Sequence, residues 1–134
     1  MASTFQLEIA TPERLLVREQ AVEAQIPAAN GYLGVLAEHS PLLAAMGSGE
    51  LTFVSEGRKR SLAVDGGWVQ VLPNRVRVLV DRAEHADQID AARAQNALKR
   101  AQERVLNPLP GIDVARALNA MKRAQARLAA ASRS

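Results

Sequence analysis

The sequence predicts an α+β fold, with an N-terminal all-β sandwich of about ten strands followed by a C-terminal antiparallel α-helical hairpin. Three observations support this prediction. Up to Asp81, short segments of alternating apolar and polar residues are separated by turn residues, as in sandwiches. Beyond that point, apolar residues recur at the three- and four-residue spacings of helices. Finally, residues 89–105 (IDAARAQNALKRAQERV) and 112–128 (IDVARALNAMKRAQARL) are identical at 12 of 17 positions, which indicates two matching helices.

The strands are predicted from segments in which every second residue is apolar and can face a core. Residues 5–9 (FQLEI), 22–26 (VEAQI) and 76–80 (VRVLV) show this pattern. Turn residues such as Asn30-Gly31 and Asp65-Gly66-Gly67 separate such segments. Further short strands are expected at residues 33–36, 51–54, 60–64 and 68–72.

The change from strands to helices falls at residues 84–87. We therefore expect a β-sandwich domain over residues 1–86 and a two-helix domain over residues 87–134. Asp87 is the expected N-cap of the first helix, with Asp90 in its first turn, because carboxylates there accept hydrogen bonds from free backbone N–H groups.

The first helix should end near Leu106, because Pro108 moves the preceding residue out of the helical conformation. Asp113 is the expected N-cap of the second helix. The short connection between two helices of similar length favours an antiparallel pair. Each helix carries one narrow apolar stripe, so the seam between them is expected to be rich in alanine.

Charge is distributed unevenly along the chain. Residues 1–87 hold 8 basic and 11 acidic side chains, whereas residues 88–134 hold 9 basic and 3 acidic ones. A basic hairpin can meet an acidic protein surface, a polyphosphate or nucleic acid. A small β domain whose basic hairpin binds nucleic acid is therefore the alternative function, although the helical part lacks the aromatic residues on which bases stack.

Catalysis by this chain alone is not expected. The two histidines, His39 and His85, have no motif spacing to each other or to carboxylates, and there is no cysteine. The glycine-containing segments lack the Lys-Ser/Thr of a phosphate loop. We expect no catalytic residue, no metal site and no required cofactor. The lack of cysteine and of a secretory signal favours a reducing compartment.

One series of motifs resembles the epsilon subunit of the F-type rotary ATP synthase, bacterial type. Residues 31–43 (GYLGVLAEHSPLL) follow that family's pattern G-x-L-G-(V/I)-L-x-x-H-x-P-L-L. One departure is Ala37-Glu38, where the family often has Pro-Gly. The resemblance covers nearly the whole chain and continues, in order, through residues 47–49 (GSG), 65–71 (DGGWVQV), 76–79 (VRVL), 81–84 (DRAE) and the two helices.

The resemblance implies a rotor subunit of the F1 part of a proton-translocating ATP synthase. Its sandwich would bind the central gamma shaft and the membrane c ring, at the cytoplasmic face of the bacterial inner membrane and peripheral to it. Tyr32 would approach the c ring, and His39 would lie near the rotor contacts; alternatively, His39 only satisfies a turn.

The resemblance also implies a regulatory role for the helical hairpin. In that family the hairpin is compact against the sandwich in one state. In the other it extends toward the catalytic alpha and beta subunits, where it blocks ATP hydrolysis. Alanine-rich stripes bury little area, so the two states are expected to lie within a few kcal/mol of each other.

A possible regulatory ligand is ATP. Residues 89–94 (IDAARA) resemble the I/L-D-x-x-R-A motif with which some bacterial epsilon subunits bind ATP. Other interpretations remain: Asp90 serves as a first-turn acid, the arginines are exposed helix formers, and residues 112–117 (IDVARA) repeat the same motif. The site implied by the resemblance consists of Glu84, Ile89, Asp90, Arg93, Arg123 and Arg127.

Overall fold

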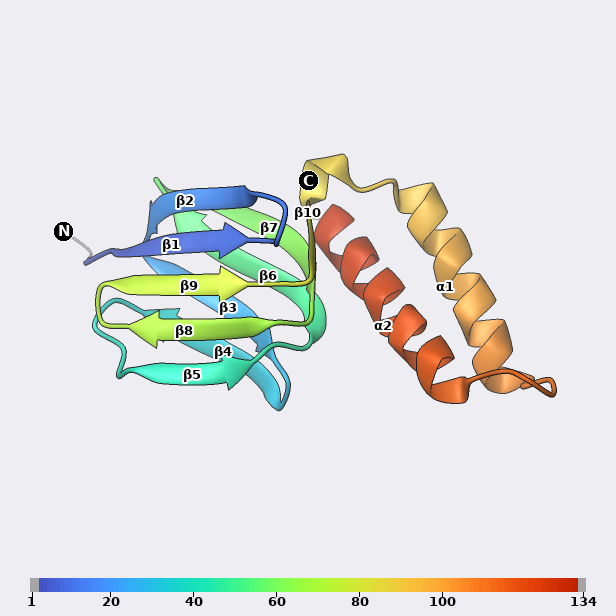
Figure 1. The fold of residues 1–134 in the computed structure, drawn as a ribbon. Helices are drawn as coiled ribbons and strands as arrows, with labels where there is room; N and C mark the ends of the chain where they lie inside the picture. Colours follow the sequence, from blue (N-terminus) through green and yellow to red (C-terminus); the bar gives the residue numbers. More distant parts are fainter. Residues whose placement is uncertain (1–2, 133–134) are drawn as a thin grey trace.

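The computed structural model describes residues 3–132, and it confirms the predicted sandwich followed by a helical hairpin (Figure 1). Ten strands precede a turn of 3-10 helix, η1 (Ala86–Gln88), and the helices α1 (Ala91–Leu106) and α2 (Val114–Ala131). The strands are β1 (Phe5–Ala10), β2 (Leu15–Ala21), β3 (Glu23–Ala28), β4 (Gly31–Leu36), β5 (Leu42–Ala45), β6 (Ser48–Ser55), β7 (Arg58–Asp65), β8 (Trp68–Leu72), β9 (Arg75–Leu79) and β10 (Arg82–His85).

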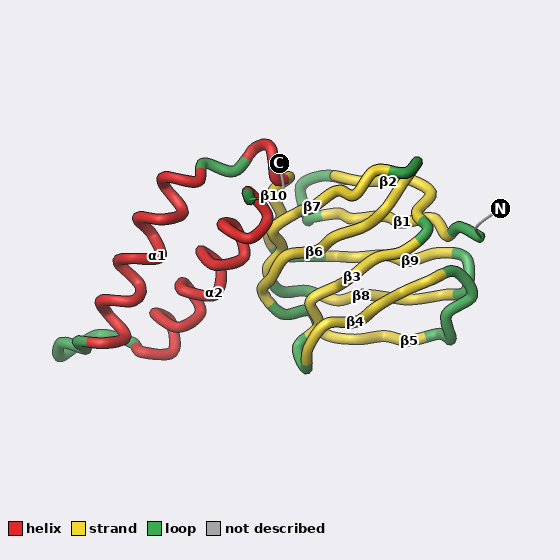
Figure 2. Tube along the Cα trace, turned by 180° about the vertical axis from the view of Figure 1, so that it is seen from behind, coloured by secondary structure: helices red, strands yellow, loops and turns green. Residues whose placement is uncertain are grey.

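The strands form two five-stranded sheets that pack face to face (Figures 1 and 2). The first sheet has the order β2-β1-β9-β8-β5, and the second has the order β10-β7-β6-β3-β4. Neighbouring strands are antiparallel except β1 and β9, which are parallel. The predicted alternation holds: Phe5, Leu7 and Ile9 of β1 are buried between the sheets, whereas Gln6 and Glu8 are only partly buried.

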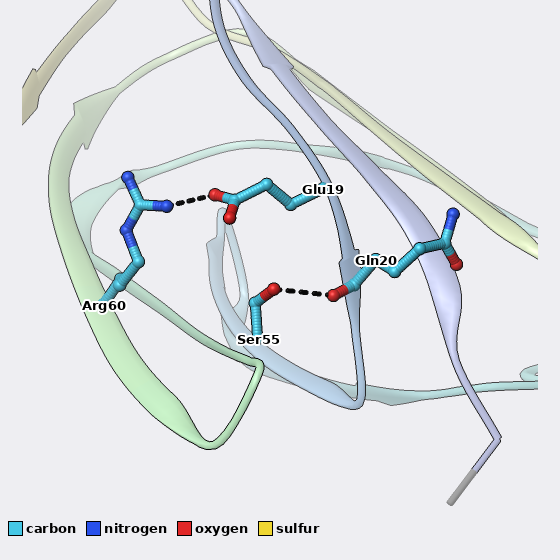
Figure 3. Close-up of polar contacts among 4 residues, drawn as sticks. All are labelled: Glu19, Gln20, Ser55 and Arg60. Atoms are coloured by element: carbon cyan, nitrogen blue, oxygen red, sulfur yellow. Dashed lines mark hydrogen bonds and ion pairs between the residues drawn. The ribbon is translucent and has the colours of Figure 1, made fainter.

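Polar contacts join the two sheets at the edge formed by β2 (Figure 3). The Oγ of Ser55 on β6 donates a hydrogen bond of 2.8 Å to the carbonyl oxygen of Gln20 on β2. Beside it, the guanidinium of Arg60 on β7 forms an ion pair with Glu19 on β2. These contacts connect strands that belong to different sheets and so fix the sheets relative to each other.

The expected start of the first helix was wrong. Asp90, not Asp87, is the N-cap of α1, and its Oδ1 accepts a hydrogen bond of 3.0 Å from the backbone N of Arg93. Asp87 lies in η1, and Ile89 after it is extended, so no helix runs continuously from Asp87. The other expectation holds, because Asp113 caps α2 in the same way.

The hairpin has two packing interfaces. Alanines on the predicted stripes are buried where α1 and α2 face each other: Ala94, Ala101, Ala117 and Ala124. A different face of α2 lies on β6 and β7, where Ala126 and Ala130 pack on Ala63. This small alanine cluster is separate from the sandwich core, which contains no helical residue.

Candidate functional site

A cleft of ≈ 270 Å³ lies where the hairpin meets the sandwich. Residues of β6, β7, β10 and both helices line it. Its charged side chains are five arginines and two carboxylates, so its net charge is positive; these residues are Arg82, Arg100, Arg104, Arg123, Arg127, Asp65 and Glu84.

The helix geometry explains why the arginines converge. Arg100 and Arg104 are four residues apart on α1, and Arg123 and Arg127 are four apart on α2, so each pair extends from one helix face. The alanine seam lets the two helices approach closely, and alanines between the arginines also line the cleft. The small side chains thus leave the space that the arginines surround.

One ion pair crosses the cleft between α2 and β10. The Nε of Arg127 lies 2.8 Å from Oε1 of Glu84, without the linear geometry of a hydrogen bond, and its Nη2 donates to Oε2 at 3.5 Å. Among residues 3–132, the other cleft arginines form no ion pair. Within the described part of the chain, four positively charged side chains of one cleft therefore have no carboxylate partner.

The structure brings together half of the residues implied for ATP. Glu84, Arg123 and Arg127 line the cleft, whereas Ile89, Asp90 and Arg93 do not. Ile89 packs against the alanine cluster, Asp90 caps α1, and the Arg93 side chain is exposed. Our sequence reasoning did not place Arg82, Arg100 and Arg104 in the site, although the four-residue spacing of arginines in both helices was a visible signal.

A second candidate site is an apolar row across the outer face of the first sheet. Its members are direct cross-strand partners on all five strands, in the order Ala45, Trp68, Leu79, Ala10 and Leu15. Trp68 is 56% exposed, Leu79 58% and Leu15 48%. The row therefore presents large apolar side chains to solvent on a rigid sheet.

A charged row lies next to the apolar one. Glu8 on β1 pairs with Arg77 on β9 and Arg18 on β2, and its Oε2 lies 3.8 Å from Nε of Arg77 and 3.9 Å from Nη2 of Arg18. An exposed apolar centre with a charged border is the usual anatomy of a protein interface.

Tyr32 and His39 lie apart. Tyr32 is at the start of β4, 61% exposed, and its hydroxyl accepts a hydrogen bond of 3.2 Å from the backbone N of Glu50. His39 is in the loop after the other end of β4, where its Nδ1 lies 2.7 Å from the carbonyl oxygen of Ser40. Glu38 before it has a φ of 66°, a conformation that favours glycine.

Neither helix in the described part of the chain is both long and apolar enough to cross a membrane. No group of three or more His, Asp or Glu side chains within residues 3–132 is arranged to hold a metal ion.

Comparison with known families accounts for both parts of the chain. Residues 4–86 match the β-sandwich domain of the ATP synthase delta/epsilon chain, and residues 87–132 match its long α-helix domain. The chain belongs to the ATP synthase delta/epsilon chain family. The resemblance described from the sequence motifs is thereby confirmed.

Two relatives in the delta/epsilon family illustrate how much of this chain such matches cover. The ATP synthase epsilon chain of Solibacter usitatus (strain Ellin6076) is 55% identical over 133 residues, or 99% of each chain. That of Koribacter versatilis (strain Ellin345) is 46% identical over 105 residues, which cover 78% of this chain and 74% of the relative.

Two solved structures that contain a chain of similar fold are parts of mitochondrial ATP synthases. A chain of the Euglena gracilis mitochondrial ATP synthase (OSCP/F1/c-ring, rotational state 1) has a TM-score of 0.79 at 22% identity, covering 89% of this chain and 76% of that one. A chain of the Tetrahymena thermophila mitochondrial ATP synthase (central stalk/c-ring) has a TM-score of 0.59 at 13% identity, covering 98% and 96%.

Proposed function

We propose that this chain is a non-catalytic epsilon subunit of the F1 part of a bacterial proton-translocating ATP synthase. In this role it joins the gamma shaft to the c ring, peripheral to the cytoplasmic face of the inner membrane, and its hairpin inhibits ATP hydrolysis. The exposed apolar row on the first sheet is the observation that carries the proposal.

The apolar row is the proposed contact with gamma. Trp68, Leu79 and Leu15 expose about half of their area; burying the exposed part would contribute roughly 1 kcal/mol for each leucine and about 2 kcal/mol for the larger Trp68. Because the row spans five hydrogen-bonded strands, it cannot deform locally when torque is applied. Tyr32 and His39, at the two ends of β4, are the proposed contacts with the c ring and the rest of the rotor.

The hairpin is the proposed regulatory part, because α2 holds it to β6 and β7 through small side chains and one ion pair. These contacts are the alanine cluster and the partly exposed Glu84–Arg127 ion pair. Each buried alanine methyl contributes roughly 0.8 kcal/mol, and a partly exposed ion pair about 1 kcal/mol or less. Release of the hairpin therefore costs little, and the released helices would contact the alpha and beta subunits.

Removal of residues 87–134 tests this division of roles. The sandwich core contains no helical residue, so the truncated chain should fold and bind gamma as tightly as the full chain does. ATP hydrolysis by the catalytic complex should be several-fold faster with the truncated chain than with the full one. Pull-down with gamma and a coupled ATPase assay measure these two properties.

The two assays separate the two parts of the proposal. Unchanged hydrolysis after truncation would contradict the regulatory role and leave the rotor role intact. Loss of gamma binding, in a truncated chain whose circular dichroism shows a folded sandwich, would contradict the assignment of the contact to the apolar row.

ATP is the proposed regulatory ligand of the arginine cleft. The supporting observation is that Arg82, Arg100, Arg104 and Arg123 have no carboxylate partner within the described residues. Phosphate oxygens would supply charge-assisted hydrogen bonds to them. Since both helices and β10 line the cleft, only the docked hairpin binds ATP, and ATP favours the compact state by mass action.

Calorimetry on the isolated chain tests this proposal. Arg123→Gln should weaken ATP binding about tenfold or more, because a hydrogen bond to a charged group contributes about 1.5 to 3 kcal/mol. Lys122→Gln is the matched control: it removes the same charge from the neighbouring residue, which is exposed and outside the cleft. Equal ATP affinity in the two variants, or no heat of binding at millimolar ATP with the wild-type chain, would contradict the proposal that the cleft binds ATP.

A further inference from the structure

We infer that a slot at the edge of the second sheet binds an extended, acidic segment of another protein, which adds to the sheet as a further strand beside β7. The slot lies between the first half of β7 and η1, and it shares no lining residue with the arginine cleft. It is also distinct from the apolar row, so the inference does not depend on the function proposed for either of those sites.

The slot exists because β10 is shorter than the strand with which it pairs. β10 pairs only with the second half of β7, residues 62–65. The first half, residues 58–61, pairs with β6 on one side and has no strand on the other. After His85 the chain turns into η1, and a cleft of ≈ 410 Å³ opens between residues 58–61 and 85–88. The cleft therefore lies where a longer β10 would run.

The backbone groups of Lys59 point toward this cleft. Along an antiparallel ladder, residues bonded to the partner strand alternate with residues that direct N–H and C=O away from it. Gly66 N donates a hydrogen bond of 3.2 Å to the carbonyl oxygen of Gly47, so every second residue counted back from Gly66 bonds to β6. Asp65 and Lys59 belong to the other series, and the Asp65 carbonyl accepts a hydrogen bond of 3.2 Å from Asp81 N. Lys59 lies beyond the end of β10, so an added strand can bond to its N–H and C=O.

The charges available in the slot are positive and lie on both faces of the sheet. Arg58 and Lys59 are exposed, and neither forms an ion pair within residues 3–132. Successive residues of a strand point to opposite faces, so these two side chains would flank an added strand on both sides. Arg60 is held by its ion pair with Glu19, and Asp87 is the one carboxylate of the described lining. An added strand with acidic side chains on both of its faces therefore complements the slot.

The slot fits a peptide better than a nucleic acid or a second copy of this chain. A phosphate backbone could meet the positive charges, but its oxygens only accept hydrogen bonds and cannot donate to the Lys59 carbonyl. The described lining also has no aromatic side chain on which a base could stack. Pairing of this edge with the same edge of a second copy would bring Arg58 and Lys59 of both copies together, which like-charge repulsion opposes. An acidic strand satisfies the backbone and the charges together, as in recognition by strand addition.

The test is an NMR titration of the full ¹⁵N-labelled chain with the capped peptide TEETEE, at one fixed ionic strength because salt screens these charges. The Lys59 amide signal should shift, and its hydrogen exchange should slow at saturation. The same peptide with every backbone N–H methylated should lose about tenfold or more in affinity, because it keeps its charge and loses its backbone donors. The basic peptide TKKTKK should not bind.

Two substitutions at one position separate the charge from the backbone. Lys59→Gln should weaken TEETEE binding about threefold, because an exposed ion pair contributes little. Lys59→Pro also removes an N–H that β6 does not use, so it should weaken binding about tenfold or more while the sheet still forms. Lys99→Gln, an exposed charge on α1 and outside the slot, is the matched control and should change nothing. Thermal unfolding checks that the variants are folded; if Lys59→Pro is not, the methylated peptide and Lys59→Gln decide.

Several outcomes would overturn the inference. Equal affinity for the methylated and unmethylated peptides would show attraction of charges without strand pairing. Binding that Lys59→Gln leaves unchanged, or no binding at millimolar TEETEE, would show that the slot does not take an acidic strand. A Lys59 amide signal that shifts with chain concentration alone would assign the slot to a second copy, and displacement of TEETEE by a short oligothymidylate would assign it to nucleic acid. None of these results bears on gamma binding or on the ligand of the arginine cleft.

Discussion

Replacing Trp68 by alanine is expected to weaken binding to the gamma subunit by about thirtyfold or more. Trp68 is the largest side chain of the apolar row and lies between Ala45 and Leu79, so it is placed as the anchor of the proposed contact. Buried interface anchors contribute about 2 kcal/mol or more, which is roughly a thirtyfold change in Kd. Biolayer interferometry with purified gamma measures the change.

The fold should tolerate this substitution. Trp68 is 56% exposed in the isolated chain, so its removal leaves no cavity in the core, and the free energy of unfolding should fall by about 1 kcal/mol or less. Gln70→Ala is the matched control, because Gln70 is exposed two residues later on the same strand, next to the charged row. Equal gamma affinity in the two variants would place the gamma contact on another face.

Much of the sandwich could be predicted because its inner strands alternate cleanly. The segments that became β1, β3 and β9 have an apolar residue at every second position, which faces the core. β2, β5 and β10 were not among the predicted strands. They lie at sheet edges, pair on one side only, and show irregular burial, so their existence depends on long-range pairing that periodicity does not reveal.

The start of α1 shows the limit of local reasoning. Asp87 and Asp90 are both acceptable N-caps, and residue preference alone does not choose between them. The choice follows from tertiary packing: Ile89 contacts the alanine cluster, and the backbone is extended there, so the helix begins after Asp90.

The cleft could be predicted only in part for a similar reason. The resemblance pointed to Glu84, Arg123 and Arg127, and these do lie together. Arg82 and Arg104 line the same cleft because α2 packs on β6 and β7 and α1 packs on α2. Sequence spacing identifies the face of one helix on which an arginine lies, but not the surface that this face meets.

In the proposed function, the work divides between the sandwich and the hairpin that packs on it. The sandwich has a continuous core and polar ties between its sheets, and it presents the proposed gamma contact. The hairpin is attached through methyl groups and one ion pair. A ligand that binds only the docked hairpin, at a hundred times its Kd, stabilises the docked state by about 2.7 kcal/mol. Such a ligand can therefore control the position of the hairpin without affecting the sandwich.

Gly67→Ala is expected to cost about 4 kcal/mol or more of the free energy of unfolding, a large part of the stability of a small domain. Gly67 has a φ of 104°, which favours glycine, and there is no room for a side chain: a Cβ there would overlap the carbonyl oxygen of Leu79 and lie 2.8 Å from Cα of Val80. These are backbone atoms of the strand that pairs with Trp68 and of the residue after it, so relief of the overlap must separate β8 from β9.

Gly57→Ala provides the matched control for this substitution. Gly57 also has a positive φ, 75°, but no atom lies within 4 Å of the position of its Cβ, so alanine there should cost only about 1 kcal/mol. Urea unfolding followed by circular dichroism compares the two variants. Because the same overlap would displace Trp68 and Leu79, Gly67→Ala should also lose gamma affinity even where it remains folded, whereas Gly57→Ala should not. Equal unfolding midpoints for the two variants would show that the turn between β7 and β8 does not hold the apolar row in place.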